Sequence, residues 1–257
     1  MIALSNMTPN LILFIFTMIS LLFIVGIYLL IRFTIKSERK KEFILKSVTV
    51  LTIVIHYSNL WVDYLLTGQA FVDDTMLFAI YPCHILMWMT FISAFIKDKS
   101  NKYFRPLLEF SAYGGVICGF IGLAFNVNFL ATPDLKNYDI FKGLISHVTL
   151  ILSGVLLFDC CKVKVNTKTN MIATIFGLLV FAIQGLFINV LFDIFNLPEV
   201  NAMYMLYSPF EKIPFINFFT IGIAALLVMF IFTTIFETIF YKKENRWYSS
   251  ITKKNRK

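Results

Sequence analysis

The sequence predicts an all-α membrane protein whose seven transmembrane helices form one bundle. Of its 257 residues, 58% are hydrophobic and 17% are aromatic, and the mean hydropathy of +0.78 is far above that of a soluble globule. Seven apolar segments are each long enough to cross a hydrocarbon core about 30 Å thick. These segments span residues 11–31, 47–66, 75–96, 107–125, 144–161, 171–192 and 215–241. The connections are short, so we expect a single domain over residues 1–257 that ends in a basic tail at 242–257.

The charged residues predict the orientation of this bundle. All but three of the 23 lysines and arginines follow the first, third, fifth and seventh segments, and the exceptions are Lys136, Lys142 and Lys212. Because basic residues concentrate on the cytoplasmic side, we expect the N-terminus outside and the C-terminus inside. The net charge of +8 then belongs to the cytoplasmic face, where anionic lipid head groups are the expected partners and nucleic acid is not.

The first segment, residues 11–31, is expected to remain as a helix. No positive charge occurs in residues 1–10, and no small-residue cleavage site follows the apolar run. A cleavable signal peptide typically has a positively charged start and a small-residue cleavage site, so the absence of both favours a transmembrane helix.

The second segment, residues 47–66, carries polar residues on one helical face. His56, Asn59 and Asp63 are spaced three and then four residues apart, which aligns their side chains along one side of a helix. A polar face must point into the bundle, because lipid does not solvate it. We therefore predict a polar chamber in the outer half of the bilayer, where these three residues bind or support a substrate.

The third segment, residues 75–96, contains Tyr81-Pro82-Cys83-His84 near its middle. Proline removes a backbone donor, so we expect the carbonyl of Phe78 to lose its helical partner and the helix to kink near Cys83. An ionisable side chain at membrane depth costs about 2.5 kcal/mol or more, so His84 indicates a functional site. The alternative for Cys83 is packing, because buried cysteines are often small apolar fillers.

The remaining segments supply a packing face, a third histidine and two amides. In residues 107–125, small residues recur at Ser111, Gly115 and Gly119, a spacing that lets helix backbones approach closely. Cys118 lies beside that face and is predicted to be a packing residue. The fifth segment, residues 144–161, carries His147 near its outer end, and the sixth, residues 171–192, carries Gln184 and Asn189. The seventh, residues 215–241, leads into the basic tail.

A cysteine nucleophile with a histidine base is the chemistry that these residues supply best. Adjacent helix positions point about 100° apart, so His84 does not readily serve Cys83. A buried thiol without help is inert, and the expected base is therefore His147 or His56 from another helix, with His84 orienting the substrate or donating a proton as a third catalytic residue. No paired-ligand spacing supports zinc, and no GxSxG elbow supports a serine hydrolase. We expect no metal and no cofactor.

Three stretches of the chain resemble the transmembrane-protein-164 family of acyltransferases and, more distantly, the YwaF-like bacterial integral membrane proteins. Residues 78–86, around Pro82-Cys83-His84, resemble the family's Asn-Pro-Cys-His helix, with Tyr81 in place of the asparagine. Residues 141–157, centred on His147, resemble its later histidine helix. Residues 200–209, which include Asn201, resemble its Asn-rich outer loop.

The resemblance implies CoA-independent remodelling of ether phospholipids, in which an acyl chain moves from a phospholipid to the sn-2 position of a lysophospholipid. It also implies that Cys83 is the catalytic residue, which would carry the chain as an acyl-thioester. Membrane phospholipids and lysophospholipids are then the expected partners. We expect Tyr81 to support the substrate and Asn201, or backbone donors near Pro82, to hold the oxyanion. A chamber that opens outward favours a lipid acyl donor over cytosolic acyl-CoA.

Other functions share these residues. A lipid hydrolase would use the same thiol with water as the acceptor, and a transporter would line a proton path with His56, Asp63 and His84. A seven-helix receptor fits the topology, but the chain lacks the DRY and NPxxY patterns. The composition, rich in Phe, Ile, Lys and Asn, indicates a bacterial plasma membrane, with the endoplasmic reticulum membrane as the alternative.

Overall fold

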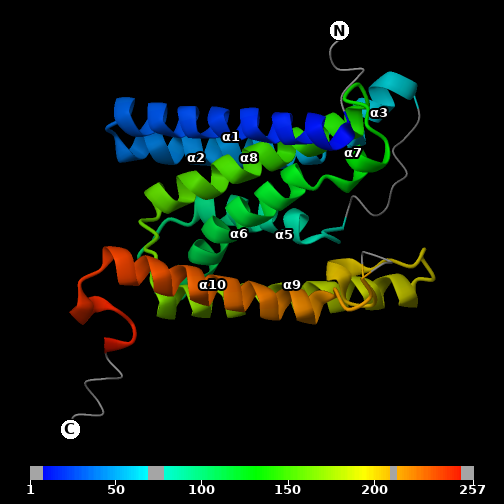
Figure 1. Ribbon diagram of the computed structural model, residues 1–257. Coiled ribbons are helices and arrows are strands. Elements are labelled where there is room, and N and C mark those ends of the chain that lie inside the picture. Colours follow the sequence, from blue (N-terminus) through cyan, green and yellow to red (C-terminus); the bar gives the residue numbers. More distant parts are fainter. Residues whose placement is uncertain (1–7, 69–77, 209–212, 250–257) are drawn as a thin grey trace. The chain divides into compact units, whose positions relative to one another are not determined.

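A computed structural model describes residues 8–68, 78–208 and 213–249, and all regular structure in these ranges is helical (Figure 1). The prediction of an all-α protein is therefore confirmed. Backbone contacts divide the chain into two compact units. The first unit comprises Met1–Leu77, Pro82–Lys97 and Ser111–Lys162, and the second comprises Phe78–Tyr81, Asp98–Phe110 and Val163–Lys257.

The first unit is built around α8. Its helices are α1 (Pro9–Thr34), α2 (Glu38–His56), α3 (Asn59–Thr67), α5 (Pro82–Phe95), most of α6 (Arg105–Ala124), α7 (Val127–Ala131) and α8 (Tyr138–Cys160). Helix α8 packs against α1, α2 and α5. Of the residues in the apolar stretch of α8, 72% are buried, whereas 22% are buried in the corresponding stretch of α1. Helix α8 therefore forms the core of this unit, and α1 lies on its surface.

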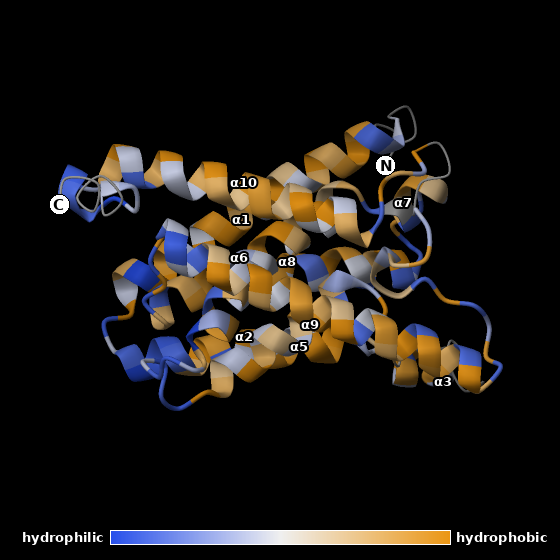
Figure 2. Ribbon diagram, turned by 90° about the horizontal axis from the view of Figure 1, so that it is seen from below, coloured by the Kyte–Doolittle hydropathy of each residue, from blue (hydrophilic) through white to orange (hydrophobic). Residues whose placement is uncertain are grey.

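Within the described residues, five helices are long and apolar enough to cross a membrane, namely α1, α6, α8, α9 (Thr167–Ile194) and α10 (Phe218–Phe240). Large apolar side chains stay exposed along several of them, for example Leu22 on α1, Ile183 on α9 and Ile239 on α10. Figure 2 shows hydrophobic residues along these helices and hydrophilic residues near helix ends. Apolar surface of this extent needs lipid to cover it, so the chain is a multi-pass membrane protein.

The expected helix over residues 47–66 is broken in two. Helix α2 ends at His56, and α3 begins at Asn59. The hydroxyl of Ser58 donates to the carbonyl of Ile55 at 2.6 Å and accepts from the Tyr138 hydroxyl at 2.5 Å. Serine often bonds nearby carbonyls in this way and so competes with the regular helix. The prediction of one continuous face through His56 and Asn59 is therefore wrong, although both side chains are buried.

Pro82 starts a helix and does not kink one. The expected helix began at residue 75, but Phe78–Tyr81 is not helical and α5 begins at Pro82. The Phe78 carbonyl accepts from the N–H of Ile80 at 2.9 Å, so it has a partner within a tight turn. Proline is favoured at the first position of a helix, where its missing N–H is not needed. The predicted kink is corrected to a helix N-terminus.

The predicted small-residue face of α6 is confirmed. A Cβ on Gly115 would lie 3.3 Å from the Cα of Gly154 on α8, and one on Gly119 would lie 3.1 Å from the carbonyl oxygen of His147. The Ser111 hydroxyl accepts from Ser93 of α5 at 2.9 Å. Helix α6 therefore approaches α8 backbone to backbone, which larger residues would prevent.

In the second unit, α9 and α10 lie side by side (Figure 1). Glu237 of α10 is fully buried and accepts from the backbone N–H of Thr167 at 2.5 Å and of Trp247 at 2.8 Å. Short 3-10 turns follow each long helix, at η1 (Ala202–Tyr204) and η2 (Lys243–Asn245). The buried carboxylate thus ties the start of α9 and the segment after η2 to α10.

Candidate functional site

Cys83 lies in the first turn of α5, directly after Pro82. The N–H groups of this turn have no partner within the helix, because four residues must precede each intrahelical donor. Backbone N–H groups of Cys83 and His84 lie beside the Cys83 sulfur. The thiol is half-buried. Partial positive charge gathers at a helix N-terminus, where backbone N–H groups can bind an anion or a developing oxyanion.

His56 and His84 form an imidazole pair between α2 and α5. Their ring centroids are 4.4 Å apart at an interplanar angle of 57°. Both residues are buried, at 5% and 7% exposure. The Nε2 atom of His56 has no hydrogen-bond partner in the described part of the chain. Buried polar atoms are nearly always paired, so this nitrogen indicates a place where a substrate atom or water binds.

A second polar group adjoins the pair at the start of α8. The amide nitrogen of Asn59 donates to Asp139 Oδ1. The ammonium of Lys142 lies 3.6 Å from the same oxygen, and Lys142 is only 4% exposed. Lys142 and His147 also lie close enough to His56 to interact with it electrostatically. Polar side chains of α2, α3, α5 and α8 therefore gather in one cluster, and the predicted chamber in the outer half of the bilayer stays a prediction.

His147 has a defined tautomer. Its Nδ1 lies 2.7 Å from the carbonyl oxygen of Gly143, and since a carbonyl only accepts, Nδ1 carries the proton. The basic nitrogen is then Nε2, which lies 2.1 Å from the point that a Cβ on Gly122 would occupy. Cys118 precedes Gly122 by about one helical turn of α6, a rise of about 6 Å, and lies near Cys83. His147 therefore contacts α6 about one turn from Cys118, and its action as the base for Cys83 stays a prediction.

The other predicted site residues lie in the second unit or outside the described residues. The side chain of Asn201 donates to the carbonyl of Tyr207 at 2.7 Å and accepts from the N–H of Leu206 at 2.9 Å, so it shapes its own loop. The ring of Tyr81 lies 5.9 Å from that of Tyr204. The side chain of Asp63 lies outside the described residues. The role of each in binding stays a prediction.

Asp139 and Lys142 are not among the site residues predicted from the sequence. Both lie just before the fifth predicted segment, outside its expected bounds of 144–161. The signal was present, because Lys142 is one of three basic residues on the sparsely basic side and Asp139 precedes it by three residues. That spacing places opposite charges on one face of a helix.

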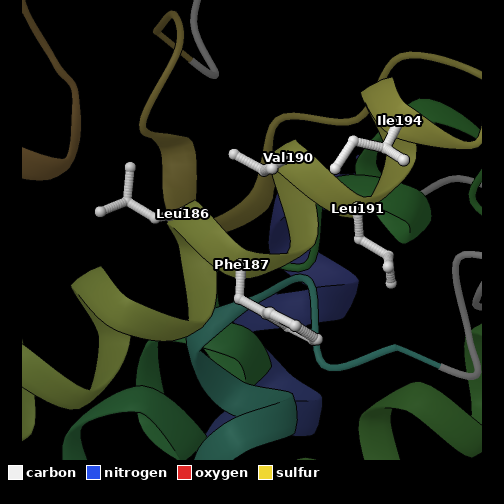
Figure 3. Close-up of a pocket in the computed structure, with 5 residues that line it drawn as sticks. All are labelled: Leu186, Phe187, Val190, Leu191 and Ile194. Atoms are coloured by element: carbon white, nitrogen blue, oxygen red, sulfur yellow. The ribbon is translucent and has the colours of Figure 1, made fainter.

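A hollow on α9 offers no polar chemistry. A hollow of about 300 Å³ on α9 is lined by Leu186, Phe187, Val190, Leu191 and Ile194 (Figure 3). These apolar side chains suit contact with lipid chains and supply no reacting group. Among residues 8–68, 78–208 and 213–249, no group of three or more His, Cys, Asp or Glu side chains is arranged to hold a metal ion.

Comparison with known protein families identifies the family of this chain. The family model described as the TMEM164 family matches residues 5–236. The chain belongs to this family. The matched region of this TMEM164 family member includes Cys83 and all three histidines, and it ends within α10. No curated protein and no solved structure matches the chain.

Proposed function

We propose that the protein is an integral membrane acyltransferase that moves an acyl chain between a phospholipid and a lysophospholipid through a thioester on Cys83. The observation that carries the proposal is the position of Cys83 in the first turn of α5, beside backbone N–H groups and near Cys118 of α6, which lies one turn from the glycine that His147 contacts. Membership of the TMEM164 family supports the assignment, because the proposed nucleophile and histidines lie inside the matched region.

In the first step, the Cys83 thiolate attacks the carbonyl carbon of a phospholipid ester. Proton removal falls to His147, whose Nε2 is the basic nitrogen because Nδ1–H is held by Gly143. Backbone N–H groups at the start of α5 stabilise the oxyanion as the tetrahedral intermediate forms. The carbon–oxygen bond then breaks, the lysophospholipid leaves with the proton from His147, and the acyl chain remains on sulfur.

In the second step, the hydroxyl of another lysophospholipid attacks the thioester carbonyl. His147 accepts the hydroxyl proton, the carbon–sulfur bond breaks, and the thiolate returns to its place at the helix start. His56, His84 and Lys142 supply hydrogen-bond donors and positive charge for a phosphate-bearing substrate. Phosphate recognition by these groups requires no cofactor.

We infer that α2 with α3, and α5, also cross the membrane, giving seven crossings with the N-terminus outside. Helix α5 has 14 residues and ends at Phe95, just before Lys97. At about 1.5 Å per residue it covers about 20 Å of a hydrocarbon core about 30 Å thick. Cys83 then lies about 10 Å below the outer surface of that core, within reach of ester groups of outer-leaflet lipids.

The test uses purified full-length protein in nanodiscs, with a labelled lysophospholipid as the acceptor and an unlabelled phospholipid as the donor. Wild-type protein is expected to form labelled diacyl product and to gain the mass of one acyl chain, removable by hydroxylamine. Cys83→Ala should abolish both signals. Cys118→Ala is the matched control, since it removes a neighbouring thiol on α6, and it should retain both.

Two results would contradict the proposal. Full acylation of lysophospholipid by Cys83→Ala protein excludes the thioester mechanism. Release of free fatty acid in place of diacyl product, at equal rates with and without added lysophospholipid, assigns the site to a hydrolase.

A further inference from the structure

A hollow of about 590 Å³ with a mixed polar and apolar lining lies at the start of α9, within the second unit. Its lining combines the cationic side chains of Lys168 and Arg246 with the aromatic rings of Phe230 and Trp247. Apolar Met171 adds to the aromatic side. The hollow is remote in sequence from Cys83 and takes no part in the chemistry proposed above. Its mixed lining suits a ligand that has both an anionic and an apolar part.

Thr167 gives the hollow an unsatisfied hydrogen-bonding group. This residue is 3% exposed, and its Oγ1 has no hydrogen-bond partner within the described ranges of the chain. Its backbone N–H is occupied, because it donates to Glu237 at 2.5 Å. An unpaired buried hydroxyl is unfavourable. A ligand oxygen in the hollow would complete the bond, which explains why a hydroxyl is present at this position.

The charges around the hollow favour an anion. Both carboxylate oxygens of Glu237 accept backbone N–H groups, from Thr167 and from Trp247. Among the described residues that line the hollow, Glu244 is acidic and Lys168 and Arg246 are cationic. Arg246 is held in place, since Nε donates to the Tyr241 carbonyl at 2.9 Å and Nη1 to the Tyr248 hydroxyl at 3.1 Å. A fixed planar guanidinium matches the oxygens of a phosphate.

We propose that this hollow binds the phosphate of an anionic phospholipid. The phosphate lies between Lys168 and Arg246 and accepts the hydroxyl hydrogen of Thr167. Phe230, Trp247 and Met171 contact the glycerol and the first methylenes of the acyl chains. A lipid is favoured over a free phosphate because the apolar side of the hollow would otherwise face water, and because the long α9 and α10 bring their exposed apolar side chains into lipid.

The test measures binding of dioctanoyl phosphatidylglycerol to the full-length protein in detergent by native mass spectrometry. The double variant Lys168→Gln/Arg246→Gln should weaken binding about tenfold or more, since each charge-assisted hydrogen bond contributes strongly. The matched control Lys162→Gln/Lys164→Gln removes the same charge outside the hollow, and it should change binding less than about twofold because exposed charges are screened. Equal losses in the two double variants would overturn the proposal.

Thr167→Val separates ligand binding from folding. Valine keeps the shape and removes the unpaired hydroxyl, so the melting temperature without lipid should stay unchanged or rise. Binding of phosphatidylglycerol should nevertheless weaken about threefold or more. Unchanged binding by this variant contradicts the proposal. So does equal binding of dioctanoyl phosphatidylcholine, or of inorganic phosphate alone, because neither result requires an anionic lipid.

Discussion

Gly122→Ala should displace His147 and destabilise the first unit. The added Cβ would lie 2.1 Å from Nε2 and 2.2 Å from Cδ2 of the His147 ring. Normal contacts are about 3.5 Å, so the ring must move by about 1.4 Å. That movement breaks the 2.7 Å bond from Nδ1 to Gly143. Overpacking costs about 1–3 kcal/mol and the lost hydrogen bond about 1 kcal/mol, which together give about 2–4 kcal/mol.

The assay is thermal unfolding of the purified protein in detergent, combined with a double-mutant cycle. At about 2–4 °C per kcal/mol for a chain of this size, Gly122→Ala should lower Tm by about 10 °C. In a His147→Ala background, Gly122→Ala should leave the stability to thermal unfolding almost unchanged, because the clashing ring is gone. Gly26→Ala is the control, since a Cβ there has no atom within 4 Å. An equal loss of Tm on Gly122→Ala in the wild-type and His147→Ala backgrounds would refute the clash between Gly122 and His147.

Three further predictions concern buried polar groups and the start of α5. Glu237→Ala leaves the N–H groups of Thr167 and Trp247 without their acceptor and should cost about 3 kcal/mol in thermal unfolding, whereas Glu244→Ala should cost little. Ser58→Ala and Tyr138→Phe remove two ends of one hydrogen bond, so their effects on unfolding free energy should not add, and additive effects would contradict the contact. Pro82→Ala should cost less than about 1 kcal/mol because Pro82 occupies a helix start, and a larger loss would contradict that position.

Helix type and approximate bounds could be predicted from the sequence wherever apolar runs were uninterrupted. The predicted 171–192 and 215–241 correspond to α9 at Thr167–Ile194 and α10 at Phe218–Phe240. Hydropathy, however, contains no information about local hydrogen bonds. The break between α2 and α3 depends on Ser58, whose partner Tyr138 is 80 residues away in the sequence. Such a contact forms only after the helices pack, so no local pattern could reveal it.

The candidate site was predictable in part. Residue type and helical spacing indicated His56, Asn59, His84 and His147, and the structure brings His56 and His84 into ring contact. The kink predicted at Pro82 is wrong, because a proline inside an apolar run is compatible with either a kink or a new helix start. Only the non-helical Phe78–Tyr81 distinguishes the two. Lys142 was overlooked because its charge placed it outside the predicted span.

Packing and chemistry are coupled through α6. Its glycines allow α8 to approach closely, and that approach brings the basic nitrogen of His147 to Gly122, one helical turn from Cys118. A side chain larger than hydrogen at Gly122 therefore acts on stability and on the proposed base at once. Gly154→Ala should act on stability first, since its Cβ would meet backbone atoms of Ala112 and Val116 at 2.8 Å. Loss of activity in excess of the loss of folded protein for Gly122→Ala, but not for Gly154→Ala, would assign His147 a chemical role beyond packing.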